Sequence, residues 1–213
     1  MQRFTDLLVQ KRCFGCNFAT DYFCSNCRKG FRPKNYRLPN GLLFRTLSQQ
    51  NPAMMRAISG WKDRHLTSLT NCFADLLVDT EPALAANHEM QIVIPPQRKR
   101  AFATRGFYAM GQLAAELQRR NPNLKFDPDA VYYRREPRDQ RGLSIKQRAE
   151  NVEEVFAVNL KTDFPMLVLD DVWTTGSTLR QLILTLKNPE QVTNILVLAT
   201  AYKISARDVW QSG

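Results

Sequence analysis

The stretch 166–186 constrains the fold of this chain most. It contains, in order, the apolar residues 167–169, the acids Asp170 and Asp171, a hydroxyl-rich segment around Gly176, and a further apolar run. Consecutive apolar residues suit a strand covered on both faces, as in a parallel sheet, and the final run suits a helix. Parallel sheets place ligands outside the carboxyl ends of their strands. The stretch therefore predicts an α/β fold, a mostly parallel sheet flanked by helices, with two acids at a strand end.

The segment after the acids has the composition of a phosphate-binding turn. Gly176 allows a tight turn, so that free amides at the following helix start point at one anion. A plain strand–turn–helix crossover is the alternative, but two adjacent acids ending a buried strand are costly without a partner. We therefore favour a phosphate site beside Asp170 and Asp171. Its expected ligand-binding residues are Thr174, Thr175, Gly176, Ser177 and Thr178.

Four cysteines near the N-terminus form two Cys-x-x-Cys pairs, separated by residues 17–23: Cys13, Cys16, Cys24 and Cys27. This spacing places four thiolates around one tetrahedral ion, for which zinc is the natural choice. A disulfide pair is disfavoured without an export signal, and a redox dithiol needs only one such pair. The segment is too small to bury its own core, so the metal should hold it folded. We predict a zinc-binding module over 1–35 and a second domain over 36–213.

The remaining elements are predicted from local signals. Asn51-Pro52 is a typical helix start, with Asn capping and Pro in the first turn. Residues 33–40 are expected to form a linker and 42–47 an edge strand. Buried strands are expected at 91–96, before a long loop, and at 192–201, which supports a mostly parallel sheet with helical crossovers.

The net charge of +10 suggests an anionic partner such as a nucleic acid. Residues 95–148 hold thirteen Lys and Arg against five Asp and Glu, so much of the excess lies there. A cluster this dense beside a phosphate turn indicates contacts to pyrophosphate or to nucleic-acid phosphates. The candidate residues are Arg98, Lys99, Arg100, Arg105, Arg134 and Arg135.

Five aromatic residues are interleaved with basic residues in the first 34 positions: Phe14, Phe18, Tyr22, Phe23 and Phe31. They could stack on the bases of single-stranded nucleic acid. Alternatively, most of them pack a small core beneath the metal, which we favour. No run of about eighteen apolar residues occurs, and no apolar signal segment is found, so we expect a cytoplasmic protein without a transmembrane helix.

The run Asp170-Asp171…Thr174-Thr175-Gly176-Ser177-Thr178 resembles the phosphoribosyl-pyrophosphate signature of type I phosphoribosyltransferases. The resemblance implies that the turn binds the 5′-phosphate and that the acids contact the ribose hydroxyls.

The whole chain resembles the ComF family of competence proteins, with its GntX-like members, which join a four-cysteine zinc module to a phosphoribosyltransferase-like domain. Besides the cysteines and the phosphate turn, the matching positions are Ile58, Lys62, Pro95, Arg105-Gly106-Phe107, Arg134 or Arg135, Gln140, Leu143, Arg148, Asn151, Val152 and Phe156. Three departures are Tyr108 where the family usually has Asn, Pro95-Pro96 where Pro-Val-Pro is common, and the bulky Trp173 before the turn.

The resemblance implies a role in natural transformation, with incoming single-stranded DNA and other competence proteins as partners. An active phosphoribosyltransferase is the competing class. There, Asp170 and Asp171 would hold the ribose of phosphoribosyl pyrophosphate directly or through Mg²⁺, and the basic residues would neutralise the pyrophosphate. A regulator that senses phosphoribosyl pyrophosphate and binds nucleic acid is the third class.

Overall fold

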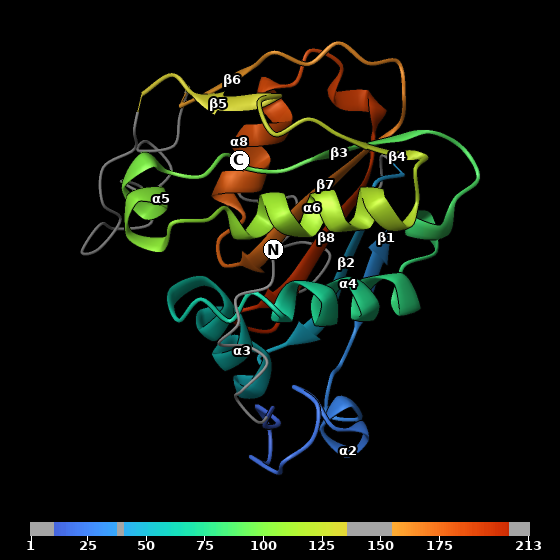
Figure 1. The fold of residues 1–213 in the computed structure, drawn as a ribbon. Helices are drawn as coiled ribbons and strands as arrows, with labels where there is room; N and C mark the ends of the chain where they lie inside the picture. Colours follow the sequence, from blue (N-terminus) through green and yellow to red (C-terminus); the bar gives the residue numbers. More distant parts are fainter. Residues whose placement is uncertain (1–10, 38–40, 136–154, 205–213) are drawn as a thin grey trace.

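The computed structural model describes residues 11–37, 41–135 and 155–204, and its centre is a six-stranded sheet (Figure 1). The strand order is β1-β2-β8-β7-β3-β4, and all neighbours are parallel except β1 and β2. The predicted α/β class is confirmed. The strands are β1 (Lys34–Arg37), β2 (Leu43–Gln49), β3 (Met90–Val93), β4 (Leu124–Phe126), β7 (Met166–Trp173) and β8 (Val192–Thr200).

The helices cover both faces of the sheet. They are α2 (Ser25–Arg28), α3 (Pro52–Asp63), α4 (Leu69–Thr80), η1 (Pro82–Ala85), α5 (Lys99–Arg105), α6 (Ala109–Arg120), α8 (Ser177–Thr185) and η2 (Pro189–Gln191). A two-stranded antiparallel ribbon of β5 (Val131–Tyr133) and β6 (Phe156–Val158) lies apart from the main sheet. In the described part of the chain, no helix has the length and apolar character needed to cross a membrane.

Alternating side chains of β7 separate two hydrophobic cores. Leu167 and Leu169 pack with α3, α4 and α6 on one face, whereas Met166 and Val168 pack with α8 and the β5–β6 ribbon on the other. All four side chains are buried, as expected for a parallel strand covered on both faces. The central position of β7 follows directly from this apolar run.

Helix α3 begins where the sequence predicted. The Asn51 side-chain oxygen accepts hydrogen bonds from the backbone N–H groups of Ala53 at 2.9 Å and Met54 at 3.1 Å, and Pro52 is the first helical residue. These bonds satisfy two of the N–H groups that every helix start leaves without a helical partner. The Asn51-Pro52 pattern was therefore sufficient to predict where α3 begins.

Three predictions of local structure were wrong. Strand β2 is not at the edge, because Lys34–Arg37 in the predicted linker forms β1 and pairs with it. The loop expected after β3 contains the helix α5. Strand β7 continues beyond Asp170 and Asp171 to Trp173, because β8 pairs with it as far as Thr200. The two acids therefore lie within the carboxyl-terminal half of a strand rather than after it.

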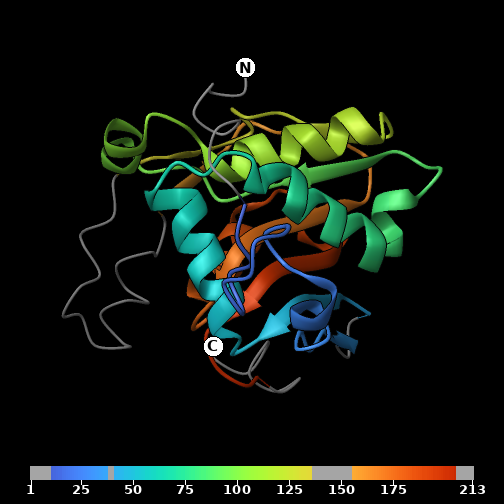
Figure 2. The same cartoon turned by 60° about the horizontal axis from the view of Figure 1, so that its bottom comes forward.

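The cysteine-bearing segment 11–31 packs directly on α3, as the view in Figure 2 shows. The Arg56 guanidinium donates a hydrogen bond of 2.6 Å to the carbonyl of Phe14, and the Asn51 amide donates one of 3.2 Å to the carbonyl of Gly30. The Phe14 ring lies so close to Gly60 that a Cβ atom there would be 3.3 Å from it. Helix α3 is therefore held by this segment along its length.

Most of the aromatic residues of the segment pack rather than face solvent. Tyr22 and Phe23 are buried in the core formed with α3 and α4, and Phe14 and Phe31 pack against the same core. Only Phe18 among the five has an exposed side chain, at 70%. The packing interpretation therefore holds for four of them, although the core is shared with the helices. The predicted division at residues 35 and 36 falls within β1 and stays a prediction.

Candidate functional site

The two acids of β7 meet a lysine from α3. The Lys62 ammonium lies 2.5 Å from a carboxylate oxygen of Asp171, and the two side chains are 25% and 13% exposed. The other acid, Asp170, accepts a hydrogen bond of 2.9 Å from the backbone N–H of Asp171. The pair is therefore partly buried and carries one ion pair across 109 positions of sequence.

Asp170 differs from Asp171 in its electrostatic surroundings. Burial, and then the negative charge of Asp171, raise the pKa of Asp170 to about 7, although the Asp171 backbone N–H and Lys62 act in the opposite direction. Two adjacent carboxylates cannot both ionise without cost. Near neutral pH, Asp170 can therefore either donate or accept a hydrogen bond.

Tyr108 lies beside these acids, at the position where the ComF-like pattern has Asn. Its hydroxyl donates a hydrogen bond to the Pro95 carbonyl after β3. Burial, and then the charge of Asp170, raise the pKa of Tyr108 above its usual range, so its phenol stays neutral. The tyrosine is thus bonded to the end of β3 and lies within electrostatic range of the acids of β7.

The predicted phosphate turn joins β7 to α8. Gly176 has a left-handed backbone with φ of 75°, and α8 starts at Ser177 without a side-chain capping bond. The Thr175 and Ser177 hydroxyls are 2.8 Å apart, and Thr174 is exposed. The Ser177 N–H donates a long hydrogen bond of 3.5 Å to the Thr175 hydroxyl, and the other amides of the helix start, with the helix dipole, favour an anion there. We call the set Lys62, Tyr108, Asp170, Asp171 and residues 174–178 the strand-end site.

The side chains of Trp173 and Tyr202 support the turn. The Trp173 indole is buried and packs edge-on against Phe44, with ring centroids 4.9 Å apart. It also fills the space under Gly176, where a Cβ atom would lie 2.2 Å from the indole. The Tyr202 hydroxyl donates a hydrogen bond to the Thr174 carbonyl. The bulk of Trp173 is thus placed beneath the turn and supports it.

The candidate basic residues fall on two segments. Arg98 precedes α5 and is partly buried, Lys99 is exposed, and Arg100 and Arg105 lie within α5. Arg134 and Arg135 follow β5 and are exposed. Figure 1 places α5 toward the same end of the sheet, on the left of the view, as the end of β7 and the start of α8. The ComF-like positions from Gln140 to Val152 lie outside the described residues.

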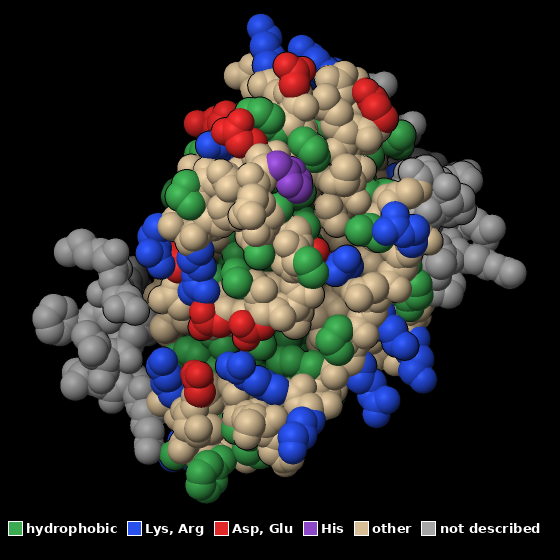
Figure 3. Space-filling view, turned by 90° about the vertical axis from the view of Figure 1, so that its right-hand side faces the viewer, with side chains coloured by type: hydrophobic (Ala, Val, Ile, Leu, Met, Phe, Trp, Pro, Cys, Tyr) green, Lys and Arg blue, Asp and Glu red, His purple; other side chains and the backbone are tan. Residues whose placement is uncertain are grey.

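Positive charge is not confined to this side of the molecule. Figure 3 views the right-hand side of Figure 1, where Lys and Arg side chains are scattered between groups of Asp and Glu. The net charge alone therefore does not locate a binding surface. To locate a binding surface, the other side chains that lie beside the basic residues must be considered as well.

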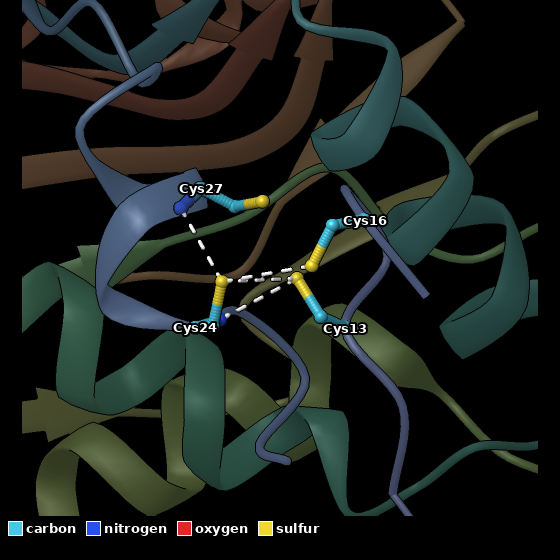
Figure 4. A group of neighbouring side chains, drawn as sticks. All are labelled: Cys13, Cys16, Cys24 and Cys27. Atoms are coloured by element: carbon cyan, nitrogen blue, oxygen red, sulfur yellow. Dashed lines mark hydrogen bonds between the residues drawn. The ribbon is translucent and has the colours of Figure 1, made fainter. Parts of the chain in front are cut away.

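The four N-terminal cysteines converge on one point (Figure 4). Their sulfur atoms all lie within 4.8 Å of one another, with Cys13 and Cys24 at 3.7 Å and Cys16 and Cys24 at 3.8 Å. Tetrahedral zinc with bonds of about 2.3 Å needs sulfur atoms about 3.8 Å apart. The four thiols, brought together as predicted, could therefore hold a metal ion.

Backbone groups favour a thiolate at this cluster. Burial of Cys13 opposes ionisation, but the N–H groups of Cys16, Cys24 and Gly15 outweigh it and lower the pKa of the thiol to about 6. Hydrogen bonds with the Cys24 and Cys13 thiols raise the pKa of Cys27 to about 12. In addition, the Cys27 N–H donates to the Cys24 sulfur at 3.4 Å. Such N–H···S bonds are the kind of outer contact that orients metal ligands.

Neither the models of known protein families nor the curated proteins contain a match to this chain. The strand-end site therefore has to be interpreted from its own residues. Sequence reasoning found its acids and its turn but assigned no role to Lys62 or Tyr202. Lys62 was visible as part of the Ile58-x-x-x-Lys62 pattern, whereas no sequence signal marks Tyr202.

Replacing Gly176 with Ala should destabilise the protein much more than replacing Gly41 with Ala. Both glycines have positive φ, but a Cβ atom meets Trp173 at position 176 and nothing within 4 Å at position 41. We expect about 1 kcal/mol for Gly41→Ala and roughly 3 kcal/mol for Gly176→Ala, from the added overpacking. Urea unfolding measures both; equal losses would contradict support of the turn by Trp173.

Proposed function

We propose that the strand-end site binds a phosphorylated ribose of the phosphoribosyl-pyrophosphate type. One observation carries the proposal: a single strand–turn–helix unit presents two carboxylates and a helix start that follows a glycine at the carboxyl edge of a parallel sheet. Carboxylates accept hydrogen bonds from sugar hydroxyls, and helix-start amides bind phosphate. In this proposal Asp170 and Asp171 contact the ribose, and the amides and hydroxyls of residues 174–178 hold the 5′-phosphate.

The test is calorimetric titration of the protein with ribose 5-phosphate and with phosphoribosyl pyrophosphate. Replacing Asp170 and Asp171 together with Asn should weaken binding of ribose 5-phosphate by about tenfold or more, because a hydrogen bond to a charged group contributes about 1.5–3 kcal/mol. Asp163→Asn removes an exposed carboxylate elsewhere and should change nothing. Absence of binding by the unaltered protein, or equal binding by the double variant, would refute the proposal.

As a second function we propose handling of single-stranded DNA in the cytoplasm during natural transformation. What supports contact with a single strand is the presence of exposed aromatic side chains among the basic residues. Phe102 of α5 is 53% exposed and lies in the same short helix as Lys99. Tyr132 of β5 is 50% exposed, and Arg134 and Arg135 follow it after Tyr133. Exposed rings beside cationic side chains form stacking platforms for unpaired bases, with phosphate contacts alongside.

Replacing Phe102 and Tyr132 with Ala should weaken binding of a labelled oligothymidylate by about tenfold or more, at about 1–3 kcal/mol per stacked base. Leu184→Ala, on the exposed side of α8, is the matched control and should have no effect. Fluorescence anisotropy measured over a salt series should also show affinity falling steeply as salt rises. A flat salt response, or equal losses in the control, would exclude this mode of binding.

We further propose that the metal of the cysteine cluster is a structural zinc ion. Four sulfur ligands suit zinc, and the segment that carries them buries Tyr22 and Phe23 in the main core. Such a metal would fix residues 11–31 against α3 rather than take part in chemistry.

Purified protein should contain one zinc per chain by mass spectrometry, and Cys13→Ser together with Cys16→Ser should lose it. Because the segment contributes to the core, the variant should also melt at least several degrees lower. Cys72→Ser alters the fifth cysteine, which lies outside the cluster, and should keep the zinc. Retention of a full equivalent by the double variant would show that the metal is held elsewhere.

A further inference from the structure

The cation at the acid pair comes from the chain itself. Lys62 lies in the last turn of α3 and contacts Asp171 at 2.5 Å. We propose that the Lys62 ammonium takes the place of a divalent metal ion at Asp170 and Asp171, so that the site binds phosphorylated ribose without a metal. This inference rests on the proposed sugar-phosphate function and deepens it.

The acid pair does not fit a magnesium ion. Asp171 is engaged by Lys62, and Asp170 accepts the backbone N–H of Asp171. Among the described residues, the one group of three or more potential metal ligands is the cysteine cluster, so no third carboxylate or histidine joins the pair. Magnesium in proteins is usually held by one or two carboxylates with waters and substrate phosphates, so the number of carboxylates is not what opposes it here. The obstacle is the Lys62 ammonium, which already occupies Asp171 and would repel a divalent ion.

Lys62 is positioned by rigid neighbours. The adjacent Trp61 is fully buried, and its indole N–H donates a hydrogen bond of 3.0 Å to the Thr70 hydroxyl of α4. Nearly two turns before Lys62, the bond from Arg56 to the Phe14 carbonyl ties α3 to the cysteine-bearing segment. The anchored helix thus fixes the backbone at Lys62 near Asp171, so that only the entropy of the lysine side chain remains to be lost when the ion pair forms.

The fixed ammonium also accounts for how acids and a phosphate can share one site. Two ionised carboxylates would repel a phosphorylated ligand, whereas a lysine bound to one of them removes that charge before the ligand arrives. Preorganised charge of this kind costs no reorganisation on binding. A carboxylate oxygen not facing Lys62 is left to accept a sugar hydroxyl.

The test is titration of ribose 5-phosphate, which lacks the pyrophosphate that itself binds magnesium, in EDTA and in Mg²⁺. The unaltered protein should bind equally in both, within about twofold, which is about 0.4 kcal/mol. Lys62→Met keeps the length of the side chain but removes the charge. It should lose about tenfold or more in EDTA and regain part of that with Mg²⁺. Lys62→Arg should stay independent of metal.

Manganese paramagnetic resonance supplies a readout that does not depend on the sugar. Lys62→Met should gain a Mn²⁺ site that disappears when Asp171→Asn is added, and the unaltered protein should show none. Lys187→Met, which removes an exposed lysine at the other end of α8, is the control and should behave as the unaltered protein. Melting curves of each variant show whether it is folded.

The outcomes separate the two proposals. If ribose 5-phosphate binds only with Mg²⁺, or if Lys62→Met binds in EDTA as the unaltered protein does, the role of Lys62 is refuted and the sugar-phosphate site stands. If ribose 5-phosphate binds in neither condition, the proposed function itself fails. Equal binding in both conditions, combined with a metal requirement created by Lys62→Met, supports both.

Discussion

The ion pair between Lys62 and Asp171 connects helix α3 to the central strand β7 at the strand-end site. One partner belongs to α3, which the cysteine-bearing segment holds through Arg56 and Gly60, and the other belongs to the central strand β7. A partly buried ion pair is favourable only where the surrounding structure fixes both partners, because desolvation offsets much of the attraction. The buried Trp61 and the strand β8 supply that fixation here. The pair is therefore a consequence of the packing around it.

The cysteine-bearing segment shares its hydrophobic core with the α/β domain. Tyr22 and Phe23 are buried with residues of α3 and α4, and β1 continues the segment into the main sheet. A segment of this size has too little apolar surface to fold alone. The segment overcomes this by sharing the core of α3 and α4, and the proposed metal would stabilise it further. Its contacts with α3 help to fix the helix that carries Lys62, although the segment contributes no residue to the strand-end site.

The sequence predicted what is encoded locally and missed what depends on distant partners. Strand β7, the Gly176 turn, the Asn51 cap and the cysteine cluster each follow from a short pattern, and the structure has all of them. Strand β1 was missed because Lys34–Arg37 has no apolar alternation and forms only by pairing with β2. The contact of Lys62 with Asp171 was missed because α3 and β7 are brought together by tertiary packing alone. No local sequence pattern predicts a tertiary contact of this kind.

The strand-end site combines groups that would conflict if each were considered alone. A pair of carboxylates repels phosphate, yet a helix start attracts it, and both belong to one short unit of chain. The conflict is reduced in two ways. Lys62 neutralises Asp171, and burial beside that residue raises the pKa of Asp170 to about 7, so that this acid carries only part of its charge near neutral pH. Because both effects arise from packing around the acids, the proposed binding of an anionic sugar would require no rearrangement of charge in the site.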